Sequence, residues 1–276
     1  MKRSLYTVIL CDLSFFLFLV LVSMSEGVLA TLLYYLAFLF PIAIGVIAIR
    51  WGACCENATP PRLLRTNFTS ALPFVFPTVL AVLLVSYLTA LLLGDRMAYF
   101  GTADMGGDLL AAIVSHALIP AVFEEILFRF IPLRLLGGHS PRYAVLLTSL
   151  FFALVHHSVV SIPYAFVAGV ALAALTLASD SIYPAIIIHF VNNLVSVLSL
   201  YFAADFPGIN EIIWLCLCGL TLISFIFIII KRREYSSALS STLAVGDGYD
   251  GGLAPLVIAI PTVFVAAVEL IAVMSK

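Results

Sequence analysis

Long apolar runs occupy most of this 276-residue chain and limit the folds that are open to it. A bilayer core of about 30 Å needs about 20 apolar residues per helix, whereas the strands of a membrane barrel would alternate in hydrophobicity. The runs here are continuously apolar, so they predict helices. The chain is 63% hydrophobic and 10% charged, and a soluble domain has about 25% charged residues. The sequence therefore predicts an all-α, polytopic transmembrane helix bundle.

The predicted bundle has about 8–9 spans, counted as runs near the length of a bilayer-crossing helix. The fifth run is short and the first carries Asp12, so eight spans are nearly as well supported as nine. The candidate spans are residues 5–24, 27–49, 71–94, 109–133, 142–157, 161–179, 182–204, 211–230 and 253–274. The sequence divides into N-terminal spans and loops over 1–107, a core over 108–205, and C-terminal spans with a flexible polar loop over 206–276.

Basic residues collect in the loops on one side of the predicted bundle. Cytoplasmic loops of membrane proteins carry an excess of lysine and arginine, so an integral multi-pass protein with a cytoplasmic N-terminus is expected, most simply in the cell membrane. The net charge of −2 gives no indication of a nucleic-acid partner. The basic residues on this side are Lys2, Arg3, Arg50, Arg62, Arg65, Arg134, Arg142, Lys231, Arg232 and Arg233.

Three charged residues interrupt the fourth apolar run, at Glu124, Glu125 and Arg129. A charged residue near the bilayer centre costs about 2.5–3.5 kcal/mol of insertion free energy. Three charged residues without a structural or functional role would therefore oppose insertion of this helix. Glu125 and Arg129 are four residues apart and share a helix face. Glu124 is rotated about 100° from Glu125 and can face elsewhere. Such residues predict a functional site inside the membrane.

Two further polar pairs lie in later apolar runs, at Phe152 with His156 and at His189 with Asn193. Measured from the Gly/Pro-containing turn at 137–142, Glu124 lies about 20 Å along its helix and His156 about 21 Å along the next one. His189 and Asn193 lie about 12–20 Å beyond the turn that precedes them. The four ionisable or amide side chains can therefore occupy one layer of the bilayer.

Some of these residues also have a purely structural interpretation. A buried pair of Glu125 and Arg129 can hold helices together. His116 and His157 are expected to bond a neighbouring helix or to face the surface. The joint occurrence of four further polar residues at one depth favours a functional site: Glu124, His156, His189 and Asn193.

The chemistry that such a site supports is hydrolysis. A carboxylate beside an imidazole can take a proton from water. A second histidine and an asparagine can donate hydrogen bonds to a developing oxyanion, provided that the facing histidine nitrogen carries a proton. Zinc or another divalent metal stays open, with Glu124, His156 and His189 as its ligands if one is present. No cofactor is favoured, because the chain has no His-Glu-x-x-His motif.

These residues resemble the pattern of the CPBP intramembrane protease family, which contains type II CAAX prenyl endopeptidases and bacteriocin-processing or immunity proteins. The three motifs are Glu124-Glu125-x-x-x-Arg129, Phe152-x-x-x-His156 and His189-x-x-x-Asn193. The resemblance covers about residues 108–205. It implies an all-α membrane bundle whose site opens toward the cytoplasm.

By that resemblance, Glu124 and His156 would activate water, and His189 and Asn193 would stabilise the oxyanion. The supporting residues would be Glu125, Arg129 and Phe152. One departure is Phe130, where the family usually has glycine. This departure weakens a close assignment to the prenyl-processing branch.

Two functions from different classes follow. The first is an intramembrane endopeptidase that hydrolyses a peptide bond in a membrane-anchored or prenylated peptide or protein, using water activated by glutamate and histidine. The alternative is a non-catalytic membrane immunity or scaffold protein whose polar cluster holds helices together. A transporter is a weaker option, because no corresponding pair of broken helices is evident.

Overall fold

The computed structural model describes residues 2–52, 63–64, 69–93, 108–137, 140–156, 161–202, 205–206 and 208–237. Seven helices in this part of the chain are long and apolar enough to cross a membrane, and one shorter apolar helix accompanies them. The described residues form no strand beyond an isolated bridge between Leu64 and Ser181. The prediction of an integral, multi-pass, all-α bundle is confirmed, and the predicted span 253–274 lies outside the described residues.

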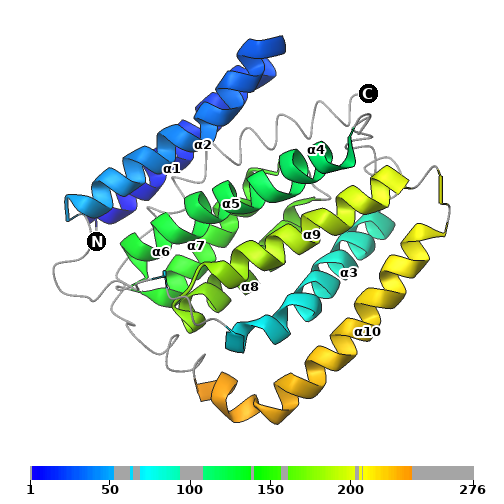
Figure 1. Ribbon diagram of the computed structural model, residues 1–276. Helices are drawn as coiled ribbons and strands as arrows, with labels where there is room; N and C mark the ends of the chain where they lie inside the picture. The colour runs from blue at the N-terminus through cyan, green and yellow to red at the C-terminus, as the bar shows by residue number, and fades with distance from the viewer. Residues whose placement is uncertain are drawn as a thin grey trace.

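The helices follow the predicted runs closely (Figure 1). Figure 1 shows the α1–α2 pair at one edge of the bundle and α10 at the opposite edge, with α3 and α9 between them. The elements are α1 Lys2–Ser23, α2 Gly27–Arg50, η1 Thr69–Phe74, α3 Val75–Leu93, α4 Leu109–Ile113, η3 Val114–Leu118, α5 Ile119–Glu125, η4 Ile126–Phe130, α6 Ile131–Leu136, α7 Pro141–Leu154, α8 Ser161–Ser179, α9 Tyr183–Phe202 and α10 Ile209–Ile230.

The fourth span runs from α4 to α6 and contains two π-helical segments, η3 and η4. In each, the residue after the segment donates its N–H five residues back, from Ile119 to Val114 and from Ile131 to Ile126. Pro120 and Pro132 follow directly and have no N–H to continue the ordinary ladder. Proline therefore gives a local cause for both segments. They bracket α5, the short helix that carries both glutamates.

Aromatic rings connect the α1–α2 pair to the middle of the bundle. The ring of Phe15 lies 5.1 Å from that of Phe38 and 5.5 Å from that of Phe128, centroid to centroid. The Phe128 ring in turn lies 5.7 Å from the ring of Phe152 in α7. The pairs Phe15–Phe128 and Phe128–Phe152 are edge-to-face, an arrangement that adds stability beyond area burial. The N-terminal pair thus packs against the elements that carry the candidate site.

Small residues allow α7 and α8 to approach closely. A Cβ atom placed on Gly169 would lie 2.9 Å from the Cα atom of Ser149. Membrane helices use such small residues at their contacts because van der Waals packing replaces the hydrophobic effect there. α7 has only 14 residues, which gives a length of about 21 Å. This is shorter than a bilayer core of about 30 Å, so α7 is too short to cross a membrane along its axis.

Two connections differ from what the sequence suggests. Leu63, between the predicted spans 27–49 and 71–94, is fully buried and donates its N–H to Asp180 Oδ1 at 3.0 Å. Its carbonyl accepts the N–H of Ile182 at 3.0 Å, so this segment is attached to the α8–α9 turn. The flexible polar loop that the sequence predicts after the span 211–230 begins with helical residues, because 232–237 are helical. The rest of that segment lies outside the described residues.

Candidate active site

The four side chains that the sequence placed in one layer line one cavity of about 280 Å³. Glu124 comes from α5, His156 follows α7, and His189 and Asn193 lie one turn apart on α9. The prediction that they share a place is confirmed. A water molecule occupies about 30 Å³ of liquid volume, so the cavity has room for water and part of a substrate. His116, Pro120, Ser196 and Val197 complete its wall.

A charged cluster lies behind this cavity and is fully enclosed. Glu125 and Arg129 have fully buried side chains, and Arg129 Nη1 donates to Glu125 Oε1 at 3.0 Å. The same oxygen lies 2.8 Å from Nδ1 of His189. Glu125 therefore links the fourth span to α9 across 64 residues of sequence. The predicted pair of Glu125 and Arg129 is present, and His189 is a third member that spacing could not reveal.

Glu124 has a different environment from its neighbour. Its side chain is 20% exposed, and its Oε2 lies 3.8 Å from Nε2 of His189. This separation is beyond hydrogen-bond distance for N and O atoms. The carboxylate is thus open to the cavity and available to water.

The contacts of His189 determine which of its ring nitrogens carries hydrogen. The carboxylate of Glu125 already accepts from Arg129 and acts as an acceptor. Nδ1 of His189 must therefore be the donor in the 2.8 Å contact with Glu125. Nε2 then points toward the cavity side, where Glu124 lies. Nε2 can donate as well only when the ring is an imidazolium.

His156 is not inside a helix, contrary to the predicted span 142–157. α7 ends at Leu154, and the backbone N–H of His156 donates to the Ala153 carbonyl at 3.2 Å. Its ring Nδ1 lies 2.8 Å from the carbonyl oxygen of Phe152. The last carbonyls of a helix have no partner within the helix, and this ring supplies one. Because a carbonyl can only accept, Nδ1 carries hydrogen and Nε2 of the neutral ring is its acceptor nitrogen.

Phe152 lies between the two parts of the site. The Cζ atom of Arg129 is 3.8 Å from the centroid of its ring. The centroid of the Phe152 ring is also 4.8 Å from that of the His156 ring and 5.7 Å from that of the His189 ring. An aromatic face attracts a guanidinium group most strongly where water is excluded. Phe152 therefore holds Arg129 in place and orders both imidazoles.

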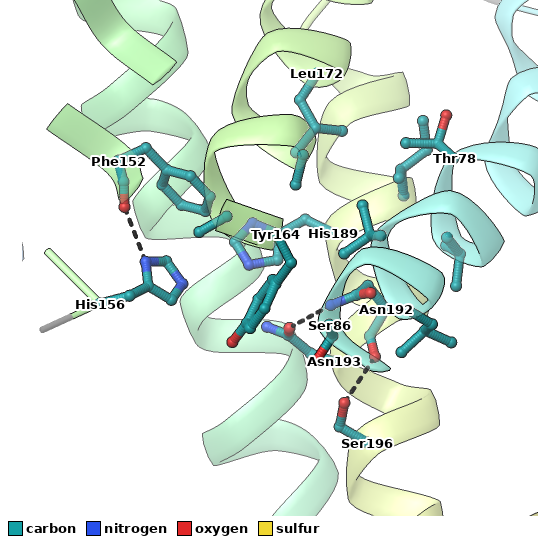
Figure 2. A pocket seen from close by; sticks show the side chains of 16 residues that line it. Thr78, Ser86, Phe152, His156, Tyr164, Leu172, His189, Asn192, Asn193 and Ser196 are labelled. Atoms are coloured by element: carbon teal, nitrogen blue, oxygen red, sulfur yellow. Dashed lines mark hydrogen bonds between the residues drawn. The ribbon is translucent and has the colours of Figure 1, made fainter. Parts of the chain in front are cut away.

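A second cavity of about 150 Å³ adjoins the first and shares His156, His189, Asn193 and Ser196 with it. Figure 2 shows Phe152 and His156 on one side of this cavity and Asn192, with Thr78 and Ser86 of α3, on the other. Asn192 Nδ2 donates to Asn193 Oδ1 at 3.5 Å (Figure 2).

Sequence reasoning missed several residues of this second wall. Asn192, Tyr164, Thr78 and Ser86 belong to none of the three motifs, and single hydroxyl or amide groups in apolar runs are common. The adjacent pair Asn192-Asn193 was the one local signal. His116, expected to face a helix or the surface, borders the first cavity. His157 lies outside the described residues.

The donor set for a metal is incomplete within the described part of the chain. No three side chains of His, Cys, Asp or Glu there lie close enough together to hold a metal ion. Glu124 and His189 approach each other at 3.8 Å, but catalytic zinc has three protein ligands. The described residues therefore do not fit the zinc site that the three residues Glu124, His156 and His189 would have formed.

Fold and site together define a multi-pass membrane protein with a polar cavity of about 280 Å³ between its helices. Residues 106–195 match the family model described as type II CAAX prenyl endopeptidase Rce1-like. This match contains all three motifs and confirms the resemblance inferred from them. Comparison with curated proteins and comparison with solved structures each gave no match.

Proposed function

We propose that the chain is an intramembrane endopeptidase that hydrolyses a peptide bond with water activated by Glu124 and His156. The observation that carries the proposal is the cavity of about 280 Å³ lined by Glu124, His156, His189 and Asn193. The family match over residues 106–195 supports the same class of reaction. In this proposal residues 108–205 are the catalytic core, with supporting spans over 1–107 and 206–276.

In the proposed mechanism, water bound between Glu124 and His156 loses a proton to the Glu124 carboxylate as its oxygen attacks the peptide carbonyl carbon. His156 accepts a hydrogen bond from this water at Nε2 and orients it. The tetrahedral intermediate then collapses, the C–N bond breaks, and the protonated Glu124 returns its proton to the leaving nitrogen. The products are a carboxylic acid and an amine, and the acid then passes its proton to the amine, so atoms and protons balance.

The oxyanion of that intermediate would be held by Asn193 and His189. Donation from His189 Nε2 requires an imidazolium, because Nδ1 already donates to Glu125. With that charge, His189 and Arg129 balance the carboxylates of Glu124 and Glu125. Asn192 donates to the Oδ1 atom of Asn193, which leaves the Asn193 NH₂ group to face the oxyanion. Donors positioned in this way are worth several kcal/mol in known hydrolases, about 10²–10³ in rate each.

The proposed substrate is a membrane-associated peptide or protein that reaches the site from the lipid bilayer. The family description names prenyl endopeptidases, so a prenylated substrate is the first class to test. The proposed mechanism uses no metal. Glu124 removes the proton from water that His156 orients, and this supplies the nucleophile that a metal-bound hydroxide would otherwise provide. The non-catalytic alternative stays open to the same test.

Substrate trapping would test the function directly. Glu124→Gln in native membranes should retain an uncleaved protein that wild-type protein converts to a shorter product, identified by mass spectrometry of both fragments. Glu125→Gln is unsuitable as the trap because it disturbs the buried cluster. Equal biological function in a well-folded Glu124→Gln protein would favour the scaffold alternative instead.

We also propose that the N-terminus lies in the cytoplasm and that the protein is in the cell membrane. The basic residues that collect in the predicted loops on one side support this orientation. A cysteine introduced at Ser240 in a cysteine-free protein should resist labelling by an impermeant maleimide in intact cells and react after permeabilisation. Labelling in intact cells would reverse the orientation.

A further inference from the structure

The basic end of α10 borders two large cavities that are separate from the cavity lined by Glu124. The first, of about 500 Å³, lies between η1 and α10 and includes Leu72, Phe76, Ile223, Phe227 and Lys231 in its wall. The second, also about 500 Å³, lies between η1, α3, α8 and α10, and Arg232 borders it. Each is far larger than a water molecule, about 30 Å³.

The second cavity has both apolar and cationic lining. Much of its wall is built from small apolar residues, including Ala71, Ala171, Ala174 and Ala178. Arg232, two residues after the last residue of the 22-residue apolar helix α10, also borders it. Among the described residues that line the two cavities there is no acidic side chain. An apolar crevice with a cationic end matches a molecule that has an anionic head and an apolar chain.

Tyr235 stands between the two cavities and lines both. Its ring is held edge-on by Phe74, with centroids 4.9 Å apart. Its hydroxyl is buried and has no hydrogen-bond partner among the described residues. Burial raises the pKa of this phenol above its ordinary value, so the group stays a neutral O–H donor. A buried donor without an acceptor costs free energy, which a bound anion would relieve.

We propose that this place binds an anionic glycerophospholipid, with one acyl chain in the cavity between α3, α8 and α10 and the phosphate on Arg232 and the Tyr235 hydroxyl. Lys231 also lies at this end, but its Nζ is 3.1 Å from Glu234 Oε2, so Arg232 carries more of the attraction. Juxtamembrane basic residues attract anionic lipids by about 1 kcal/mol each. The membrane itself supplies the ligand.

The cavity between α3, α8 and α10 adjoins the cavity that contains His189 and Asn193. Thr78 borders both this cavity and the 150 Å³ cavity that contains His189 and Asn193. The stripe Ala71–Phe74–Thr78 on η1 and α3 continues toward Ser86 at helical spacing. An acyl chain that follows the stripe from Arg232 would reach Thr78, next to the candidate active site but outside its catalytic residues.

Native mass spectrometry of delipidated full-length protein would test the proposal. Phosphatidylglycerol should remain bound at activation energies that remove phosphatidylcholine of the same chains, and glycerol 3-phosphate should not bind. Arg232→Gln should lower phosphatidylglycerol retention about fivefold, by the attraction expected of one basic residue. Arg233→Gln is the matched control, because Arg233 is adjacent and exposed but borders neither cavity.

Two further variants separate the head and chain contributions. Tyr235→Phe removes only the unpartnered hydroxyl and should weaken phosphatidylglycerol retention about fivefold to tenfold without changing the fold. Ala174→Phe fills the chain cavity and should abolish retention, whereas Val167→Phe on the exposed side of α8 should not. Gel filtration would establish folding of each. Equal losses in Arg232→Gln and Arg233→Gln, or unchanged binding in Tyr235→Phe, would overturn the proposal.

Discussion

Glu124 and Glu125 are adjacent in α5, yet the two sides of that helix differ in almost every physical respect. Glu125 is fully buried and shares one oxygen between Arg129 and His189. Glu124 is 20% exposed and borders a cavity of about 280 Å³. One residue of helical rotation thus separates a carboxylate committed to protein contacts from one that can meet water. In the proposed mechanism Glu125 positions the surrounding side chains, and Glu124 is the base.

The buried side is also incompletely satisfied. Glu125 Oε2 and the Nε and Nη2 atoms of Arg129 have no hydrogen-bond partner among the described residues. The ring of Phe152 covers the guanidinium at 3.8 Å and compensates in part. Folding stability is sensitive to substitution in such a cluster, because removal of one charge leaves the others unpaired in a low-dielectric interior. Substitutions on the cavity side of α5 should therefore lower activity, and substitutions on its buried side should lower stability.

The largest expected effect is on the cavity side. Glu124→Gln keeps the shape of the side chain but removes the base, so peptidase activity should fall about 10²–10⁴-fold while the protein stays folded. His156→Ala should lose activity comparably. The double variant should be little worse than either single one, because residues that act as a unit are not additive.

A cleavage assay on the trapped substrate would measure these losses, after detergent gel filtration has established folding. Full cleavage by a folded Glu124→Gln protein would place the base elsewhere.

On the buried side, Glu125→Gln and Arg129→Met should each destabilise the protein by about 3–5 kcal/mol, because each leaves an uncompensated buried charge. Folded yield and thermal stability in detergent would measure this. The double variant should recover yield relative to either single one. Wild-type stability in both single variants would contradict a structural role for the pair.

Asn193 should give an intermediate effect that belongs to the cavity side. Asn193→Ala should lower kcat about 10²–10³-fold if the amide donates to the oxyanion, with little change in KM. Asn193→Asp keeps the shape but replaces the NH₂ donor with a charged carboxylate oxygen, so its loss should be at least as large as that of Asn193→Ala. A loss confined to KM would assign Asn193 to substrate binding instead.

The smallest expected effect is that of metal removal. The donor set at Glu124 and His189 lacks a third close ligand among the described residues, so activity should survive chelation, and purified protein should hold no stoichiometric zinc. Elemental analysis with an assay before and after chelator treatment would measure both. One zinc per chain, with activity lost on removal and restored on addition, would replace the proposed mechanism.

Sequence reasoning located the spans and the shared cavity because both depend on distances along helices. An apolar run fixes the extent of a membrane helix, and a rise of about 1.5 Å per residue fixes depth. It missed the end of α7, where the ring of His156 bonds the Phe152 carbonyl beyond Leu154. Helix ends depend on such local competition, which the hydrophobic pattern does not record.

The sequence by itself determined an all-α membrane bundle and the pair of Glu125 with Arg129, and it predicted that Glu124 and His156 lie close together, because each follows from spacing along helices. Tertiary structure decided the contact of Glu125 with His189 across 64 residues. It also brought Thr78 of α3 and Tyr164 of α8 to the wall beside Asn192. Which helices become neighbours depends on packing between faces that are apolar all round, and uniformly apolar faces carry no periodic signal that names their partner.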